Sequence, residues 1–224
     1  SIVPKLAAIL VLMRFKAATE IQAFDWPMWL GIIAIGGMIV GNFSALWQTN
    51  AKRMMAYSSI AHAGFMLSGI LLPESLGAEA VIFYGFIYLL MNLAAFYILQ
   101  FFENELGELN YQAFEGIGKA FPAMSIFLLV VFIALTGLPP TAGFNAKLFL
   151  FSSIYEQFSV NTKDIIFWVF VVGLLNTVVS LFYYIRIPYL IFFKEGNRTN
   201  NRQTKFTWQV LWSALLVLPI LLFF

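Results

Sequence analysis

One lysine of this chain lies in the middle of an apolar stretch. Lys147 stands in "AGFNAKLFLF", with hydrophobic residues on both sides. A lysine at the centre of a membrane costs about 2.5–3.5 kcal/mol on insertion scales, and this side chain has no short route to either surface. Loss of water disfavours the charged form of a lysine, so Lys147 could exchange a proton near neutral pH. The pattern favours proton transfer over simple anchoring at a membrane surface.

The same stretch contains a break in the expected helix. In "TGLPPTAGF", Pro139 and Pro140 remove two backbone donors and block a continuous helix. Gly137 and Gly143 flank them. Broken transmembrane helices are tolerated where the freed backbone lies in protein or lines a wet cavity, and they recur at the ion and substrate sites of transporters. A plain proline kink is the alternative, but a double proline between two glycines favours a functional break.

A second lysine lies in an apolar segment near the start of the chain. Lys5 follows Pro4 in "SIVPKLAAIL". It either reaches water from the start of a helix or, if Ser1 is the cut end of a longer chain, lies deeper in the membrane. No Asp or Glu lies deep in an apolar segment, so the sequence offers Lys5 and Lys147 no counter-ion. Two lysines about 10 Å apart would repel by roughly 1.7 kcal/mol at an effective dielectric of 20, which suits a relay.

The single histidine stands one helical turn after two serines. Ser58 and Ser59 precede His62 by four and three residues, so all three share one helix face. A neutral imidazole can accept one proton and donate another, and serine hydroxyls or water could extend such a chain. A histidine with a purely structural role is the alternative.

Polar side chains also recur at helical spacing in two apolar segments. Such stripes face protein or water rather than lipid. They also hold helices together without transporting anything, so the sequence leaves a wet pathway and helix contacts equally open. The candidate lining residues are Tyr84, Tyr88 and Asn92 in one segment and Asn176, Ser180 and Tyr184 in another.

These side chains need elements that hold them inside a membrane. Of the 224 residues, 61% are hydrophobic and 11% are charged, whereas soluble domains are about 25% charged. This composition predicts an all-α polytopic membrane protein and argues against a soluble enzyme or a secreted disulfide scaffold. With no Cys and one His, we expect neither a metal site nor a redox cofactor on this chain. The net charge of +2 gives no reason to expect a nucleic-acid partner.

About seven apolar segments are candidates to cross a hydrocarbon core of ~30 Å, and the fifth is broken at Gly137–Pro140. The connection Glu103–Ala120 carries four Glu and an apolar stripe, so we expect a short helix along the membrane surface. Gly, Asn and charged residues indicate a loop over Lys194–Lys205. The expected segments are 2–18, 27–47, 54–73, 78–102, 121–157, 163–193 and 206–224.

The distribution of basic residues favours one broken helix over two short crossings. Eleven Lys and Arg lie outside Lys5 and Lys147. One broken helix puts eight of them on one side and three on the other, whereas two crossings would divide them seven to four. Because basic loops stay in the cytoplasm, the broken helix predicts that residues 103–120 and 194–205 lie inside and that the C-terminus lies outside.

Three motifs resemble those of a known family. They are "PKLAA" (4–8), "GNFSALWQTNAKRMMAYSSIAHAGFMLSG" (41–69) and "GLPPTAGFNAKLFLF" (137–151). They resemble the antiporter-like, proton-pumping membrane subunits of respiratory complex I. The resemblance extends over essentially the whole chain and is strongest to the subunit N branch, whose mitochondrial counterpart is subunit 2.

The resemblance implies an architecture. The family has fourteen transmembrane helices with two inverted five-helix repeats, so the seven segments resemble helices 8 to 14. The chain then resembles the C-terminal half of a longer subunit, with 1–224 forming a single transmembrane domain. Within it, 2–18 would be the last helix of the first repeat, 27–193 the second repeat and 206–224 an extra helix.

The resemblance also implies a function. Lys5 and Lys147 match two lysines of the family's hydrophilic axis, and His62 matches a histidine whose role in that axis stays open. We therefore expect proton translocation as a subunit of NADH:quinone oxidoreductase, coupled to electron transfer on other subunits that use NADH, flavin, Fe–S clusters and quinone. Expected partners are the antiporter-like subunit M and the small subunits J and K, in the bilayer of a bacterial inner membrane.

Two other functions fit the sequence less well. A cation/proton antiporter subunit of the multisubunit sodium–proton or hydrogenase-linked type shares this ancestry, but sodium prefers oxygen ligands such as carboxylates. A non-transporting membrane scaffold is the other alternative. It predicts that a Lys147→Leu change would leave proton pumping intact.

Overall fold

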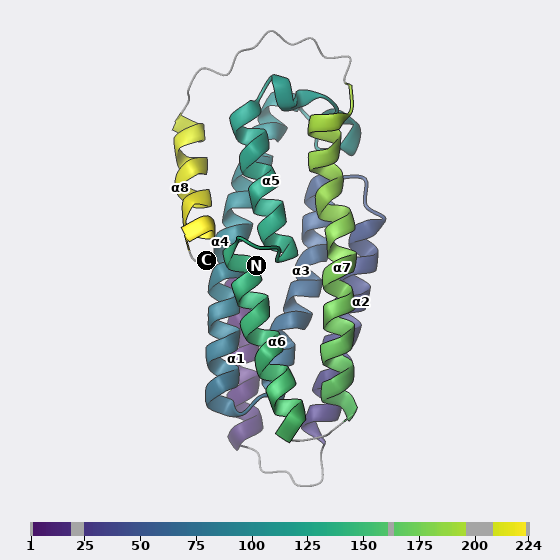
Figure 1. Cartoon of the computed structure of the whole chain (residues 1–224), viewed down its shortest axis with the longest axis vertical. Helices are drawn as coiled ribbons and strands as arrows, with labels where there is room; N and C mark the ends of the chain where they lie inside the picture. Colours follow the sequence, from purple (N-terminus) through teal and green to yellow (C-terminus); the bar gives the residue numbers. More distant parts are fainter. Residues whose placement is uncertain (1, 19–24, 161–163, 196–207, 223–224) are drawn as a thin grey trace.

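The structure is a computed structural model that describes residues 2–18, 25–160, 164–195 and 208–222. Within these ranges it contains eight α-helices, three short 3-10 turns and no strand, which confirms the all-α prediction. Figure 1 shows the helices running roughly along one axis as an elongated bundle. The helices are α1 (Ile2–Ala18), α2 (Trp26–Leu46), α3 (Ala51–Ser68), α4 (Glu74–Leu106), α5 (Pro122–Thr136), α6 (Ala142–Val160), α7 (Asp164–Phe193) and α8 (Trp208–Leu222).

Four helices of the described chain are long and apolar enough to cross a membrane. They are α2, α4, α7, and α3 together with the 3-10 turn η1 (Gly69–Leu71) that follows it. The 33 residues of α4 make about 50 Å of helix, more than the ~30 Å of a hydrocarbon core. The outer faces of α2 and α7 expose large apolar side chains such as Phe43 and Phe182. Such faces suit lipid or neighbouring membrane subunits, so the chain is a multi-pass membrane protein.

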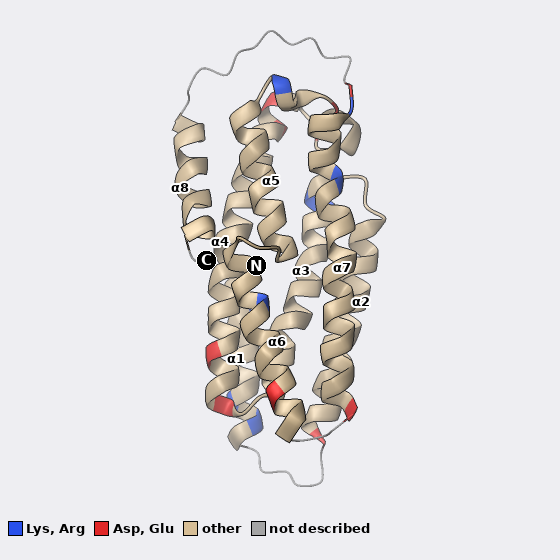
Figure 2. Cartoon of the chain, in the orientation of Figure 1, with Lys and Arg blue, Asp and Glu red and all other residues tan. Residues whose placement is uncertain are grey.

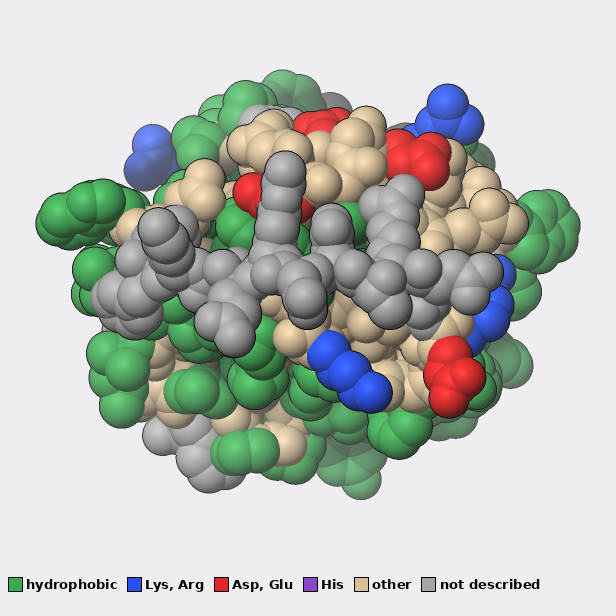
Figure 3. Space-filling view, turned by 90° about the horizontal axis from the view of Figure 1, so that it is seen from above, with side chains coloured by type: hydrophobic (Ala, Val, Ile, Leu, Met, Phe, Trp, Pro, Cys, Tyr) green, Lys and Arg blue, Asp and Glu red, His purple; other side chains and the backbone are tan. Residues whose placement is uncertain are grey.

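Charged residues lie mostly toward the two ends of the bundle (Figure 2). At the upper end, Lys194 pairs with Glu115 at 2.6 Å, and Lys52 pairs with Glu103. Seen from this end, hydrophobic side chains surround much of the rim, whereas acidic side chains lie on the end face (Figure 3). This separation suits a bundle whose sides meet apolar surroundings, because ionised side chains are costly inside a bilayer.

Helices α5 and α6 are the two halves of one interrupted helix. In Figure 1 they follow one another along the bundle axis and meet at mid-height. Helix α5 ends at Gly137, whose φ of +83° is a left-handed conformation that glycine adopts most readily. A Cβ on Gly143 would collide with the carbonyl of Ala134, so the two half-helices approach closely there. The structure confirms the break predicted at Gly137–Pro140.

The first and last helices occupy different levels of the bundle. In Figure 1, α1 lies in the lower part and α8 in the upper part, and the start of α1 and the end of α8 both lie near mid-height. Within the described residues, the predicted segments 2–18 and 206–224 therefore each cover only part of the height. Lys5 is in the first turn of α1, so it lies near the level of the α5–α6 break rather than at a membrane surface.

The connection between α4 and α5 differs from the prediction. Helix α4 continues to Leu106, and two 3-10 turns follow, η2 (Tyr111–Phe114) and η3 (Ile117–Lys119). The expected surface helix over residues 103–120 is therefore wrong. Its apolar stripe packs onto the end of the bundle because burial there removes more apolar surface from water than a position on the membrane surface. The buried residues of the stripe are Leu109, Phe114 and Ile117.

One helix begins earlier than predicted, and one predicted loop lies mostly outside the described residues. Helix α3 begins at Ala51 rather than 54, because the Asn50 side chain accepts hydrogen bonds from the backbone N–H groups of Lys52 and Arg53 at 3.0 and 3.3 Å. The predicted loop Lys194–Lys205 lies outside the described residues from position 196 onward.

Candidate functional site

Lys147 is buried at the junction of the two half-helices. It lies in the second turn of α6 and is 5% exposed. Its Nζ donates a hydrogen bond of 2.7 Å to the carbonyl oxygen of Thr136 and lies 3.5 Å from that of Leu135. These carbonyls end α5, where backbone acceptors have no helical partner and the helix dipole is negative. The carbonyl end of α5 therefore supplies a partial negative charge to Lys147, in place of the carboxylate that the sequence lacks in its apolar segments.

Two residues complete the surroundings of the Lys147 side chain. The centroid of the Phe65 ring lies 5.0 Å from Nζ, which is a cation–π distance. A Cβ on Gly137 would come within 2.6 Å of Lys147 Cδ, so the glycine leaves room for the lysine stem. Phe65 belongs to α3 and is distant in sequence, and nothing in the sequence alone pairs it with Lys147.

Lys5 is hydrogen-bonded to α3. Its half-buried side chain donates to the hydroxyl oxygen of Ser59 at 2.9 Å and to the Ser59 carbonyl oxygen at 3.2 Å. The Ser59 hydroxyl in turn donates to the carbonyl of Ala56 at 2.7 Å. The structure therefore brings together two predicted site residues that are 54 positions apart in the sequence.

His62 joins α3 to two other helices. It is 2% exposed. Its Nδ1 lies 2.8 Å from the hydroxyl of Tyr84 on α4, and its Nε2 lies 3.3 Å from the hydroxyl of Tyr184 on α7. The ring also stacks on Tyr88, with centroids 4.2 Å apart. A neutral imidazole donates at one nitrogen and accepts at the other, so both hydroxyls can exchange protons with it.

Successive turns of α3 carry the contacts to both lysines. Ser59, His62 and Phe65 follow one another at intervals of three residues, so each step along the axis is about 4.5 Å. Ser59 contacts Lys5, and Phe65 contacts Lys147. The two lysine contacts are therefore separated by about 9 Å along α3, with His62 between them.

Beside His62, two buried polar groups have no direct partner in the described part of the chain. The Tyr88 hydroxyl and the Asn92 Nδ2 make no hydrogen bond of normal geometry, although the two side chains are near neighbours on α4. Buried polar atoms of this kind are commonly satisfied by ordered water. In the first predicted stripe, Tyr84 thus forms a hydrogen bond with His62, whereas Tyr88 and Asn92 carry polar groups that suit a wet environment.

The residues of the second predicted stripe do not all contact the same partner. Tyr184 reaches His62, but Asn176 accepts a hydrogen bond of 2.9 Å from Asn42 on α2. The Ser180 hydroxyl donates to the Thr177 carbonyl of its own helix at 2.7 Å. Ser58 likewise donates to its own helix, at the carbonyl of Met55. Only part of this stripe lies at the histidine.

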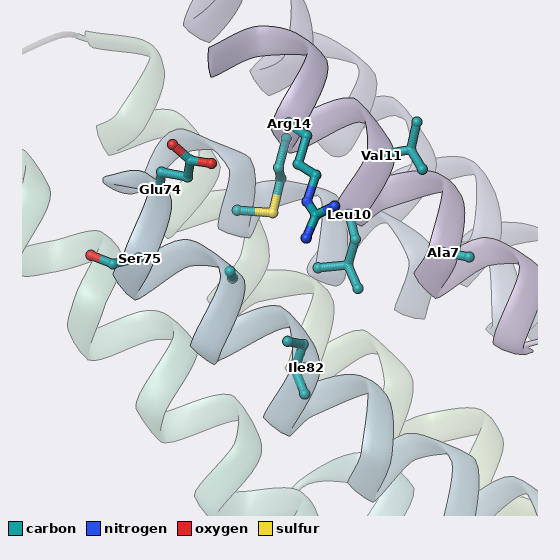
Figure 4. Close-up of a pocket in the computed structure, with 9 residues that line it drawn as sticks. Ala7, Leu10, Val11, Arg14, Glu74, Ser75 and Ile82 are labelled. Carbon is teal, nitrogen blue, oxygen red and sulfur yellow. The ribbon is translucent and has the colours of Figure 1, made fainter. Parts of the chain in front are cut away.

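Two wide grooves of the described chain lie away from these side chains. One groove of about 840 Å³ runs between α1 and α4, and Figure 4 shows Arg14 of α1 across from Glu74 and Ser75 of α4. Another, of about 770 Å³, is lined mainly by apolar residues of α4 and α6. Neither is lined by Lys5, His62 or Lys147. Among the described residues no three metal-ligating side chains converge.

Comparison with known proteins gives consistent matches. The family described as "NADH:quinone oxidoreductase/Mrp antiporter, TM" matches residues 1–180. NADH-quinone oxidoreductase subunit N 2 of Chloroherpeton thalassium is 36% identical over 230 residues, covering 99% of this chain and 44% of that protein. The protein of the same name from Sorangium cellulosum is 41% identical over 208 residues, covering 89% and 40%. The chain thus spans less than half the length of these curated relatives.

Solved structures share the fold. A chain of respiratory complex I from Thermus thermophilus with bound aureothin superposes with a TM-score of 0.69 and 28% identity, covering 88% of this chain and 43% of that chain. The archaeal membrane-bound sulfane sulfur reductase gives a TM-score of 0.74 and 26% identity, covering 86% and 38%. A chain of the Mrp complex of Dietzia gives a TM-score of 0.70 and 21% identity, covering 80% of this chain and 32% of that chain. This match shows a common fold alone.

Proposed function

The chain belongs to the NADH:quinone oxidoreductase/Mrp antiporter transmembrane family, and we propose that it moves protons across the membrane as part of a proton-translocating NADH:quinone oxidoreductase. The observation that carries this proposal is a buried lysine held by the open carbonyl end of a broken helix. Lys5 and His62 lie along the α3 face that also contacts this lysine. Together they provide three groups that can each take up and release a proton.

The proposed sequence of steps moves one proton at a time. Charged Lys5 releases a proton toward His62 through neighbouring hydroxyls or water. His62 accepts it at one ring nitrogen and releases a proton from the other, which its two tyrosine contacts allow. Neutral Lys147 then accepts a proton at Nζ and later releases it toward the outer side.

The protonation of Lys147 is linked to the junction of α5 and α6. A hydrogen bond from a charged donor is worth about 1.5–3 kcal/mol, so the Thr136 carbonyl holds the ammonium form more tightly than the neutral amine. When Lys147 loses its proton, this contact between the half-helices weakens by about 1 kcal/mol, because a neutral amine donates a weaker hydrogen bond than an ammonium group. A conformational change at this junction would in turn alter how readily Lys147 binds a proton.

Electron transfer is assigned to other subunits in this proposal. NADH, flavin, Fe–S clusters and quinone would bind there, and subunits M, J and K would be the membrane neighbours. Residues 1–224 would act as one transmembrane domain of a bacterial inner membrane, with 2–18 closing a first repeat, 27–193 forming the second repeat and 206–224 following it. The C-terminus would face outside.

The test uses the assembled parent complex in sealed vesicles, with the substitutions made in the full-length subunit. We expect Lys147→Ala to lower the rate of NADH-driven proton uptake per assembled complex by at least about tenfold. Lys147→Arg is the matched variant, because arginine keeps the cation at the α5 carbonyls but does not release a proton, and we expect the same loss. Lys194→Ala is the control, since its exposed pair with Glu115 contributes little.

The outcomes separate proton transfer from other roles. Normal proton uptake in both Lys147 variants would overturn the proposal and favour a scaffold. Loss in Lys147→Ala with retention in Lys147→Arg would show that only a fixed cation is needed. Proton uptake that depends on added sodium would favour cation/proton antiport, the second candidate, which the family description and the fold shared with the Mrp complex support.

A further inference from the structure

We infer that Asn42, Asn176 and Tyr183 form a positioning network that fixes Tyr184 against Nε2 of His62. We call these three residues the Asn42 clasp. The inference rests on the proposed function, in which His62 passes a proton through its tyrosine contacts. None of the three clasp residues contacts His62 itself through a hydrogen bond of the described structure, so their role is to position Tyr184.

The Asn42 clasp ties α2 to α7 through side chains that are completely buried or nearly so. Asn42 Nδ2 donates to Asn176 Oδ1 at 2.9 Å and to the Asn176 carbonyl oxygen at 3.0 Å. The Tyr183 hydroxyl donates to Asn42 Oδ1 at 2.8 Å. Asn176 Nδ2 donates to the carbonyl of Val172 at 2.9 Å. Each amide atom of Asn42 therefore has a partner, and a fully satisfied buried network is a rigid one.

The spacing along α7 makes this network suitable for fixing the rotation of the helix. Asn176 and Tyr183 are seven residues apart and lie on the same face, two turns from each other. Because both bind Asn42, α7 can neither rotate nor slide past α2 without breaking hydrogen bonds. Tyr184 is the next residue after Tyr183, and their ring centroids are 4.5 Å apart. The orientation of Tyr184 therefore follows from the contacts that Tyr183 makes.

Tyr184 is the partner of His62 that most needs such support. Its hydroxyl lies 3.3 Å from Nε2, whereas the Tyr84 hydroxyl lies 2.8 Å from Nδ1. Ser58 and Tyr183 are further polar neighbours of the Tyr184 hydroxyl. A small rotation of α7 would lengthen the contact to Nε2 beyond hydrogen-bond distance, while leaving the Tyr84 contact intact.

The backbone beside Asn42 brings the Asn42 clasp close to His62. A Cβ on Gly41 would collide with the backbone of Ala61, the residue before His62. Helix α2 is thus in direct backbone contact with α3 at the level of the histidine. Asn42, the next residue on α2, extends this contact to α7. This part of α2 therefore contacts both α3, which carries His62, and α7, which carries Tyr184.

The first test removes hydroxyls one at a time in the full-length subunit of the assembled complex, in sealed vesicles. We expect Tyr183→Phe to lower the rate of NADH-driven proton uptake per assembled complex by about threefold to tenfold, the effect of one hydrogen bond. Proton uptake in the double variant Tyr183→Phe/Tyr184→Phe should be no lower than in Tyr184→Phe alone, because Tyr183 acts through Tyr184. Thr177→Val is the matched control, since that hydroxyl donates only to the Gly173 carbonyl of its own helix at 3.1 Å.

The second test compares two side chains of nearly the same shape at position 42. A buried carboxyl stays neutral, so in Asn42→Asp one oxygen can still accept from Tyr183 while the acid proton is donated to Asn176. Asn42→Leu keeps the number and branching of the side-chain heavy atoms and loses both contacts. We expect Asn42→Asp to retain most of the proton uptake and Asn42→Leu to lose about as much as Tyr183→Phe.

The outcomes distinguish this inference from the proposed function, because Lys147→Ala is measured alongside. If Lys147→Ala loses proton uptake while Tyr183→Phe behaves like Thr177→Val, the inference is wrong and the proposed function stands. Additive losses in the double variant, or equal losses in Asn42→Asp and Asn42→Leu per assembled complex, would also overturn it. If Lys147→Ala pumps normally, the proposed function fails, and the inference fails with it.

Discussion

Lys147 obtains its partner from the backbone rather than from another side chain. The carbonyl oxygens of Thr136 and Leu135 carry partial charges, whereas a carboxylate carries a full one. A lysine in a buried ion pair leaves an uncompensated charge behind when it loses its proton, at a cost of several kcal/mol. The carbonyl partner leaves no such charge, so the neutral amine is accessible. This arrangement suits a lysine that must alternate between two protonation states.

His62 offers a prediction at the same scale, because two substitutions distinguish a proton relay from a structural hydrogen bond. His62→Gln can still donate and accept hydrogen bonds between the two tyrosines, but it does not titrate. If His62 carries a proton, we expect His62→Gln and His62→Phe both to lower the rate of NADH-driven proton uptake by about tenfold or more. The measurement is proton uptake and NADH oxidation in sealed vesicles, normalised to assembled complex. Normal uptake in His62→Gln together with loss in His62→Phe would identify a structural hydrogen bond instead.

The broken helix places its two open ends inside the bundle. Helix α5 has 15 residues and α6 has 19, which give about 22 Å and 28 Å of helix. Each is shorter than a hydrocarbon core of ~30 Å, so their junction falls within the membrane. The junction requires Gly137 for two reasons, since its φ is +83° and its missing side chain makes room for Lys147.

A pair of glycine substitutions separates these two requirements. Gly107 has a φ of +81° but open space around it, whereas a Cβ on Gly137 would press on Lys147 Cδ. We expect Gly107→Ala and Gly137→Ala each to destabilise the fold by about 1–2 kcal/mol through left-handed strain. Only Gly137→Ala should lower proton uptake per assembled complex. Thermal unfolding of the purified complexes checks the first expectation and vesicle assays the second. Equal proton uptake in the two variants would mean that the lysine stem adapts to the added methyl group.

The elements differ in how much of their structure the sequence could predict. The break follows from Pro139 and Pro140, because a missing backbone donor acts locally. The depth of Lys147 follows from the apolar residues around it. Its carbonyl partners, the Asn42 clasp and the inward packing of residues 103–120 depend on contacts between distant segments, and periodicity reports that a face is buried without saying what covers it. For the Asn42 clasp, the sequence offers one sign, which is the polar amide of Asn42 within the stretch "VGNFSA".

The two ends of the described molecule differ in their number of basic residues, although acidic residues lie at both. The upper end in Figures 1 and 2 carries the connection 103–120 and the start of α3, with basic residues such as Lys52, Arg53 and Lys119. The last turn of α6 lies at the opposite end, near acidic residues such as Glu156 and Asp164. Because basic segments are retained in the cytoplasm, the upper end is expected to face inside. Protons released from Lys147 toward the lower end would then leave the cell.

This orientation can be tested directly because the chain contains no cysteine. Gln112 in η2 is exposed at the upper end, and Ser159 near the end of α6 is exposed at the lower end. In inside-out vesicles, we expect a membrane-impermeant maleimide to label a Gln112→Cys variant and to spare Ser159→Cys, with the reverse result in right-side-out cells. The labelled band is that of the full-length subunit, and detergent-solubilised complex shows that both thiols can react. Labelling of Ser159→Cys from the cytoplasmic side would reverse the orientation and with it the direction of proton release from Lys147.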